Sequence, residues 1–188
     1  MIGRIKKRTA RIGVFGVGHG VYWDQFEGLL DTLMGFHEVF KKKVAENQVE
    51  VIDFGMVDGS ERSYEVLEEM KGSRIDILFV NMLTYATSSV FAPIVRNMNI
   101  PMVMVALQPR DRMDYNTANT RQQLENDNVC SVAEFAGVAI RFGKKVNDII
   151  IGTLYNDPEA DMEIARWCNI AKVLHDLKGV RFGLMGHV

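Results

Sequence analysis

RIGVFGVGHGVYW, residues 11–23, is the stretch that decides the fold. It begins with a short apolar run, residues 12–17, and continues directly into glycines, a histidine and two aromatic residues. Comparable apolar runs recur at residues 49–54, 75–81, 102–107, 148–154 and 180–184. Longer segments of helical period separate them, which is typical of βαβ units and a buried parallel sheet. The sequence therefore predicts an α/β fold, a three-layer α/β/α sandwich with a mostly parallel sheet of about six strands, Rossmann-like or flavodoxin-like.

The segments between the runs carry apolar residues at the spacing of amphipathic helices. This spacing predicts helices over residues 23–46, 61–70, 88–97, 129–140 and 158–177. The last helix has the clearest ends, because Asn156-Asp157-Pro158 supplies a cap and an N1 proline and Gly179 follows its final turn.

One long polar segment, residues 108–128, interrupts the alternation of strands and helices. Loops of that length in compact domains are usually functional or disordered. This one follows a predicted central strand at the sheet edge where open α/β sheets bind ligands. We expect it to form a ligand site or an interface, and a solvated connection is the alternative.

Composition limits the class of protein. A length of 188 residues fits one domain, so residues 1–188 are expected to form a single α/β domain. A net charge of −2 gives no reason to expect nucleic acid. No apolar run approaches the ~20 residues of a membrane span, and the start lacks the apolar region of a secretory signal. The two cysteines fit a reducing compartment, so we expect a cytoplasmic protein with neither nucleic acid nor membrane as partner.

The glycines around the first predicted turn do not form a dinucleotide-binding motif. A G-x-G-x-x-G motif that starts at Gly16 requires glycine at position 21, where the chain has Val21. The acidic residue of the second predicted strand, Asp53, is too far along the chain to be the ribose ligand of that motif. A receiver domain is disfavoured as well, because the third run ends in Asn81 rather than a phosphoacceptor aspartate.

The same turn carries side chains that suit a sugar. His19, Tyr22 and Trp23 follow the first strand, and polar groups bind hydroxyls while aromatic rings stack on C–H faces. Alternatively, Tyr22 and Trp23 begin the first helix and pack against it. Tyr85 follows the third run at the same predicted edge and faces the same crevice, or caps and packs there.

Metal ligation and nucleophilic catalysis find little support in the sequence. The four histidines are scattered along the sequence: His19, His37, His175 and His187. Two of them, His37 and His175, lie inside predicted helices and are expected to be surface or hydrogen-bonded residues. Three carboxylates lie close in sequence without a histidine beside them: Glu125, Asp127 and Glu134. Cys130 starts a helix, where a thiolate would be stabilised, but no base is placed beside it, and a buried structural cysteine is expected. We expect no metal in this chain alone.

Several segments, taken in order, resemble one family. They are VFGVGHGVYW at 14–23, VNMLTYATS at 80–88, NIPMVMVALQP at 99–109, AEFAGVAIR at 133–141 and ARWCNIAKVLHDLKGVRFGLMGHV at 165–188. In order and spacing the chain resembles the N-terminal domain of L-arabinose isomerase and, more distantly, of L-fucose isomerase.

The resemblance implies a part in aldose–ketose isomerisation. The family uses a divalent ion, usually Mn²⁺, held by later domains, so no cofactor is expected in this chain. The implied role is a substrate-adjacent and oligomerisation domain of a homo-oligomer, inactive alone, which lends contacts to a neighbouring subunit's site. Glu134, in the matching Glu-Phe pair, would anchor a helix. A non-catalytic sugar-binding or regulatory module, or an interaction domain from a truncated gene, is the alternative.

We expect the monosaccharide to be contacted by His19, Tyr22, Tyr85, Gln108, Asp127 and Cys130. Glycines flank His19 where the family has glutamine and leucine, and residues 127–130 replace its Gln-Thr-Ala-His segment. The family's loop histidine thus aligns with Cys130. A sugar other than L-arabinose is therefore expected.

Overall fold

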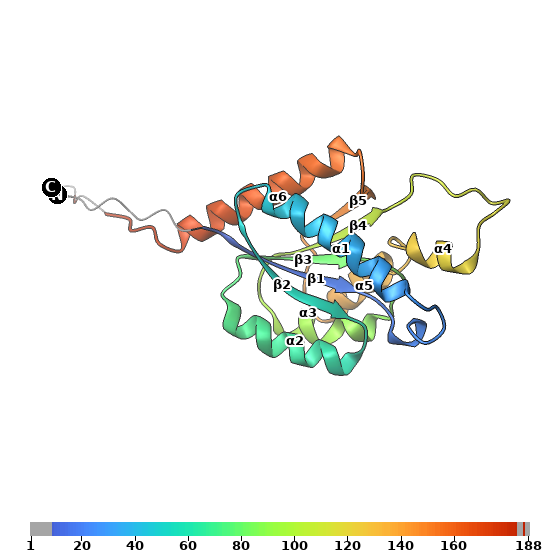
Figure 1. The fold of residues 1–188 in the computed structure, drawn as a ribbon. Coiled ribbons are helices and arrows are strands. Elements are labelled where there is room, and N and C mark those ends of the chain that lie inside the picture. Colours follow the sequence, from blue (N-terminus) through green and yellow to red (C-terminus); the bar gives the residue numbers. More distant parts are fainter. Residues whose placement is uncertain (1–8, 184–185, 187–188) are drawn as a thin grey trace.

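The computed structural model describes residues 9–183 and 186, and its centre is a five-stranded sheet in the order β2-β1-β3-β4-β5 (Figure 1). All four neighbouring pairs are parallel, which confirms the predicted α/β class. The order is that of flavodoxin-like folds. The strands are β1 (Arg11–Val17), β2 (Glu50–Val57), β3 (Ile77–Met82), β4 (Met102–Gln108) and β5 (Asp148–Thr153).

Helices cover both faces of the sheet and complete the three layers (Figure 1). One face is packed by α1 (Leu29–Ala45) and α6 (Pro158–Leu177), the other by α2 (Ser60–Ser73), α3 (Ala92–Asn97) and α5 (Val132–Arg141). None of the described helices is both long and apolar enough to cross a bilayer.

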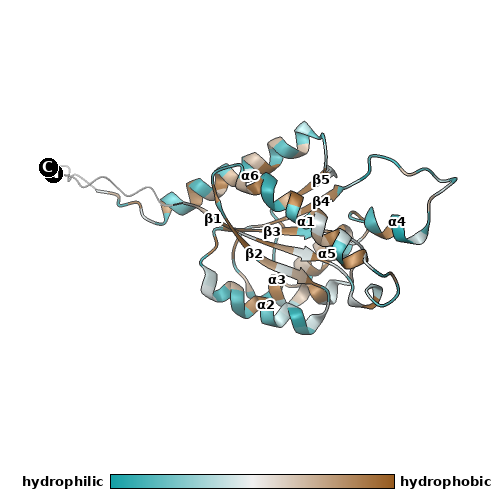
Figure 2. Ribbon diagram, in the orientation of Figure 1, coloured by the Kyte–Doolittle hydropathy of each residue, from teal (hydrophilic) through white to brown (hydrophobic). Residues whose placement is uncertain are grey.

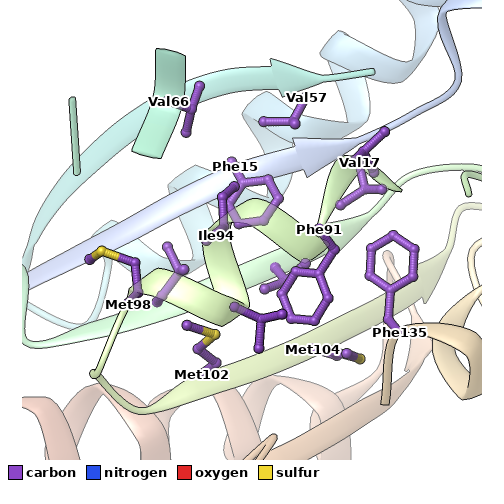
Figure 3. Packing of buried hydrophobic residues seen from close by; sticks show 14 of the residues in the cluster. Phe15, Val17, Val57, Val66, Phe91, Ile94, Met98, Met102, Met104 and Phe135 are labelled. Atoms are coloured by element: carbon purple, nitrogen blue, oxygen red, sulfur yellow. The ribbon is translucent and has the colours of Figure 1, made fainter. Parts of the chain in front are cut away.

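The core lies on the two faces of the central strands, which Figure 2 shows as the apolar middle of the fold. Successive side chains of a strand point to opposite faces, so Val14 packs toward α1 and α6 while Phe15 packs toward α2 and α3. Both layers contain aromatic pairs, and Phe91 stacks on Phe135 with ring centroids 5.0 Å apart (Figure 3). Burial on both faces explains why β1, β3 and β4 read as unbroken apolar runs.

The prediction of a sixth strand at residues 180–184 is wrong for those of its residues that the structure describes. Residues 180–183 are exposed and form no strand, with Phe182 90% accessible, and Leu184 lies outside the described residues. An apolar run becomes a strand only where a neighbouring backbone edge can pair with it. These residues follow the end of α6 and make no such pairing, so the sheet has five strands.

Helix boundaries differ from the prediction at the first and third helices. The first begins at Leu29 rather than at residue 23, because Gly28 adopts a left-handed conformation with φ of 72°. The residues before it form a 3₁₀ turn, η1 (Gly20–Tyr22), and the predicted third helix divides into η2 (Ser88–Val90) and α3. The prediction for α6 is confirmed, and its N-cap Asp157 accepts a hydrogen bond from the Ala160 amide at 3.0 Å.

The long polar segment is partly helical, which the sequence analysis did not predict. It contains α4 (Thr120–Glu125), which lies away from the sheet at the end of an extended connection from β4 (Figure 1). Asn119 and Gln122 form a capping box, in which Asn119 Oδ1 accepts from the Gln122 amide at 2.9 Å. The pattern N-x-x-Q was visible in the sequence and was the missed signal.

Asp76 ties the N-terminal ends of the strands to the end of α6. Its carboxylate is 3% exposed and accepts hydrogen bonds from the Arg11 amide, His175 Nδ1 and Lys178 Nζ at 2.6–2.8 Å. Burial alone would raise the pKa of Asp76, but these three donors outweigh it and hold the pKa below its ordinary value of 3.8. The charged carboxylate therefore stabilises the fold.

We expect this carboxylate to contribute to acid unfolding. Because the pKa of Asp76 is lower in the folded state, the charged carboxylate gives its full stabilisation above a pH of about 5. This stabilisation is lost as the pH falls through the pKa of the unfolded state and then that of the folded state. Asp76→Asn should lower the free energy of unfolding at pH 7 by about 1–3 kcal/mol. Urea unfolding at pH 7, 5 and 3 checks this: the gap between wild type and variant should narrow toward pH 3, and a constant gap would contradict it.

Candidate functional site

The candidate site lies where the loops after β1 and β3 meet at the C-terminal edge of the sheet. In the order β2-β1-β3-β4-β5, β1 is followed in the chain by β2 on one side and borders β3 on the other. The connection after β1 leads to β2 on one side, and the connection after β3 leads to β4 on the other. Ligands of open α/β sheets bind in the crevice that forms where two such connections diverge. His19 comes two residues after β1 and Tyr85 three residues after β3, so both belong to this switch point.

Three rings form what we call the aromatic cluster: His19, Tyr22 and Tyr85. The His19 ring centroid lies 5.2 Å from that of Tyr22 and 6.1 Å from that of Tyr85, with interplanar angles of 84° and 81°. Both contacts are edge-to-face, the arrangement that aromatic quadrupoles favour. All three side chains are partly exposed, so each has a portion of its surface left for a ligand.

The loop that carries His19 is held against β2. Trp23 Nε1 donates to Asp58 Oδ2 at 2.6 Å, and the Gly20 amide donates to the Asp58 carbonyl at 3.0 Å. A Cβ at Gly18 would lie 2.9 Å from the Trp23 ring, so the close approach requires glycine there. Trp23 packs against the cluster that includes Leu29 and Leu33 of α1, as Tyr22 does, and its bond to Asp58 positions the turn.

Asp127 and Cys130, on the connection from α4 to α5, lie beside the aromatic cluster. Burial is the largest cause that raises the pKa of Tyr22, followed by the charges of Tyr85, Asp127 and Cys130. The Cys130 thiol donates a hydrogen bond to Asp127, but burial outweighs this bond and raises the pKa of Asp127. Tyr22 therefore stays protonated at neutral pH and can both donate and accept hydrogen bonds.

Cys130 is exposed, which corrects the expectation of a buried structural cysteine. Partial desolvation and the charges of Asp127 and Glu134 raise its pKa, so the thiol form dominates at neutral pH and the group is a weak nucleophile. The other cysteine, Cys168, is buried, and burial raises the pKa of its thiol to about 12. Neither cysteine has the environment of a catalytic nucleophile.

Side chains from the start of α5 fasten the loop that carries Tyr85. Ser131 Oγ accepts from the Ala86 amide at 2.9 Å and donates to its carbonyl at 2.8 Å. Glu134 Oε1 accepts from the Ser88 amide at 2.7 Å and so ties α5 to the start of η2. Sequence reasoning missed Ser131, because only the tertiary contact distinguishes it from an ordinary N-cap residue.

Asn128 was also missed, and it joins the α4–α5 connection to the end of β3. Its Nδ2 donates to the Met82 carbonyl at 2.7 Å. Asn128 Oδ1 and Thr84 Oγ1 are buried and have no hydrogen-bond partner within the described part of the chain. The floor of the site therefore holds two polar atoms available to bound water or to a rearranged loop.

A hollow of about 550 Å³ opens under the polar segment and contains Gln108, the remaining predicted residue. Four amide side chains, one carboxylate, one hydroxyl and one phenol contribute to its lining, which consists of Gln108, Met113, Tyr115, Ala118, Asn119, Thr120, Gln123, Asn126 and Asp127. Asp127 lines this hollow and its charge acts on Tyr22, so the hollow and the aromatic cluster lie at the same end of the sheet. We call the two together the polar crevice.

No lysine or arginine lines this hollow, although three arginines lie on the same segment, and two of them, Arg110 and Arg112, line a separate hollow. Arg110 and Arg121 both bind the buried carboxylate of Glu125, at 3.1 and 3.0 Å. A larger hollow of about 890 Å³ lies between residues 109–114 and the end of β5, and none of the predicted site residues lines it. We base the site on the smaller hollow because two of the predicted site residues, Gln108 and Asp127, line it.

The remaining histidines of the described chain are engaged in structural hydrogen bonds, as predicted. His37 is fully buried between Asp53 and Asn81, and His175 binds Asp76. His187 lies outside the described residues. Across residues 9–183, no three His, Cys, Asp or Glu side chains are grouped so that they could hold a metal ion. The donor set of the described chain thus does not fit the divalent ion that the resemblance implies.

Comparisons with known proteins do not identify a family. No family model matches the sequence, and no curated protein matches it. Among solved structures, the chain is similar to a type II dehydroquinase from Propionibacterium acnes, with 12% identity, a TM-score of 0.42, and coverage of 86% of this chain and 99% of that one.

Two further structures are similar at the same level. A protein described as a LacI-family transcriptional regulator from Rhizobium etli has 14% identity, a TM-score of 0.36, and coverage of 81% of this chain and 59% of that one. The azoreductase AzrA has 13% identity, a TM-score of 0.31, and coverage of 88% and 99%. These similarities carry no argument about activity, so function rests on the polar crevice itself.

Proposed function

We propose that the chain is the substrate-adjacent domain of an aldose–ketose isomerase of the L-arabinose and L-fucose type, and that its polar crevice binds a monosaccharide. One observation carries the proposal: a hollow lined by four amide side chains, and by no lysine or arginine, lies at the same edge of the sheet as three rings in edge-to-face contact. The resemblance of the sequence to that family supports the identity of the enzyme class.

The lining suits hydroxyl groups. An amide side chain donates and accepts hydrogen bonds, as a sugar hydroxyl does, and the two can pair in both directions. Gln108 uses Nε2 for the Asn126 carbonyl, and Asn126 uses Oδ1 for the Arg110 amide. Within the part of the chain that the structure describes, Gln108 Oε1 and Asn126 Nδ2 make no further hydrogen bond. The volume of about 550 Å³ lies within the range of small-ligand pockets.

The proposal assigns binding, not chemistry, to this chain. Isomerisation moves a proton or hydride between two carbons, and it needs a base or a metal ion beside them. The described residues offer no group of ligands for the divalent ion that the resemblance implies. Mn²⁺ or another divalent ion would therefore be held by residues outside this part of the chain, within a homo-oligomer. A reducing cytoplasm is the compartment we propose, since the exposed Cys130 thiol is free.

A non-catalytic sugar-binding or regulatory module is the second candidate, because the same crevice would serve it. One assay distinguishes the isomerase domain from the non-catalytic module. The isomerase proposal requires that the chain, mixed with the domains that hold the metal, supports conversion of a pentose or deoxyhexose. A module would bind the sugar and leave turnover unchanged. The chain alone with Mn²⁺ is expected to show no isomerisation.

Tyr85→Ala and Gln123→Leu should each weaken sugar binding about tenfold, since each removes a stacking face or a bidentate hydrogen-bond partner. NMR titration of the labelled chain with L-arabinose, L-fucose and their ketoses gives the affinity and locates the perturbed amides. Tyr64→Ala, a tyrosine change at an exposed position on α2, is the control and should bind as wild type does. Shifts confined to residues outside the polar crevice, or none at millimolar sugar, would contradict the proposal.

A further inference from the structure

Residues 110–125 form a closed loop, because the two ends of this stretch are bonded to each other. The Arg110 amide donates to Asn126 Oδ1 at 2.9 Å, and the Arg110 guanidinium binds the Glu125 carboxylate at 3.1 Å. Directly before them, Gln108 Nε2 donates to the Asn126 carbonyl at 2.8 Å. Surface loops of this kind, whose ends meet, are frequently functional. Every residue that lines the hollow of about 550 Å³ lies in this closed loop or directly beside it, so the loop sets the shape of the hollow.

Burial of apolar side chains does little to hold the closed loop. Leu124 is 7% exposed and packs against α1, but Tyr115 is 90% exposed. Within the part of the chain that the structure describes, the hydrogen bonds of residues 111–119 reach no residue outside 111–123. Segments with few buried apolar contacts open at low cost in free energy. The closed shape therefore depends on polar contacts at the ends of the loop and on α4.

Glu125 is the residue at which those polar contacts meet. Its side chain is 9% exposed, and its carboxylate lies between two guanidinium groups, that of Arg110 at 3.1 Å and that of Arg121 at 3.0 Å. Arg121 in turn donates to the Glu27 carbonyl and, at 3.3 Å, to Thr32 Oγ1 of α1. One carboxylate therefore connects the start of the loop to its end and, through Arg121, to the start of α1.

These contacts require the negative charge of Glu125. A buried carboxylate is costly unless it is paired, and here Oε2 accepts from Arg110 while Oε1 accepts from Arg121. An amide of the same shape has one acceptor oxygen, and its NH₂ group would face the other guanidinium. Glu125→Gln therefore keeps at most one of the two contacts. Both arginines are partly exposed and stay hydrated, so the change loosens the loop without removing a packed side chain.

We propose that Glu125 is a positioning residue, which through Arg110 and Arg121 holds the closed loop against α1 and so gives the hollow its sugar-binding shape. This inference rests on the proposed function, because it concerns the same hollow. Glu125 does not line the hollow itself. It acts on two lining residues of its own helix, Thr120 and Gln123.

NMR spectroscopy of the whole chain tests the positioning role with two readouts, the affinity for sugar and the mobility of the loop. In Glu125→Gln, the heteronuclear NOEs of residues 111–120 should fall. The dissociation constant for whichever of L-arabinose, L-fucose and their ketoses wild type binds best should rise about tenfold. Glu163→Gln is the matched control and should alter neither readout, because it makes the same change at a carboxylate that binds Arg166 on α6 at 3.2 Å.

The two arginines give a readout that a merely stabilising residue would not move. Arg121→Gln breaks the link to α1 and should weaken sugar binding about as much as Glu125→Gln does. Arg110→Gln breaks only the link to the start of the loop and should weaken binding less. In the Glu125→Gln background, Arg110→Gln should add little, because the two groups act as one unit. Affinity is measured on the folded chain, so a general loss of stability would produce no such pattern.

The outcomes separate this inference from the proposed function. If wild type binds sugar and Glu125→Gln binds it equally well, the positioning role is overturned and the proposed function stands. Weaker binding without greater mobility of residues 111–120 overturns the positioning role too. If wild type binds none of these sugars, the proposed function fails and the positioning role fails with it. Circular dichroism should show that Glu125→Gln is folded; if it is not, the partly exposed Arg121→Gln decides by the same two readouts.

Discussion

Phe79→Ala is expected to lower the free energy of unfolding by about 3–5 kcal/mol, the usual cost of truncating a buried phenylalanine. Phe79 lies on β3, the central strand of the sheet, and none of its surface is exposed. Its ring meets Phe40 of α1 edge-to-face with centroids 5.7 Å apart. The substitution therefore removes a strand residue and its helix contact together, and the surrounding residues cannot close the space.

Urea unfolding, followed by circular dichroism, measures the change for Phe79→Ala, for Phe40→Ala and for the double variant. The two losses should not add, because each single change already removes the ring pair, and a coupling of about 0.5–1.5 kcal/mol is expected. Phe182→Ala, at a side chain that is 90% exposed, is the control and should change stability by less than about 0.5 kcal/mol. A loss below about 1 kcal/mol for Phe79→Ala would show that the two layers are not packed as described.

The layers and the parallel sheet were predictable because they depend on local patterns. Burial on both faces makes β1, β3 and β4 continuously apolar, and the cap and proline before α6 fix its first residue. The run at residues 180–184 has the same apolar character as a strand. Whether such a run pairs depends on a free backbone edge nearby, which composition does not report.

The candidate site was predictable only as a location. Glycines, aromatics and polar residues after apolar runs indicate the C-terminal edge of a parallel sheet, and His19 and Tyr85 do meet there. What the sequence could not show is how long-range contacts use the remaining groups. Glu125 forms ion pairs with Arg110 and Arg121, which therefore do not line the hollow. Ser131 binds Ala86, forty-five residues earlier in the chain.

His37→Ala is expected to cost about 3 kcal/mol or more, because it leaves a cavity and a buried donor without an acceptor. His37 lies on α1 and has no exposed surface. The Asn81 amide donates to its Nδ1 at 3.0 Å, which leaves the proton on Nε2 to be donated to Asp53 at 3.0 Å. One imidazole thus joins α1 to β2 and to β3, directly below the crevice.

Asp53 is held charged by this arrangement. Burial acts to raise its pKa, but hydrogen bonds from His37, Lys41 and the Gly55 amide outweigh it and keep the pKa well below the ordinary value. Lys41→Ala is therefore a matched control on the same helix: it removes one partner of Asp53 at a partly exposed position, and should cost about 1 kcal/mol or less.

Urea unfolding at pH 7 of His37→Ala, Lys41→Ala, Asn81→Ala and the His37/Asn81 double variant separates the contributions. Asn81 is 3% exposed, and in the His37→Ala variant its buried amide has lost its acceptor. Asn81→Ala should therefore lower the free energy of unfolding less in that variant than it does in wild type. If His37→Ala costs no more than Lys41→Ala, the imidazole does not join the three elements. Because Asn81 lies four residues before Tyr85 on the same segment, His37→Ala should also shift the amide resonances of residues 83–86, whereas Lys41→Ala should not.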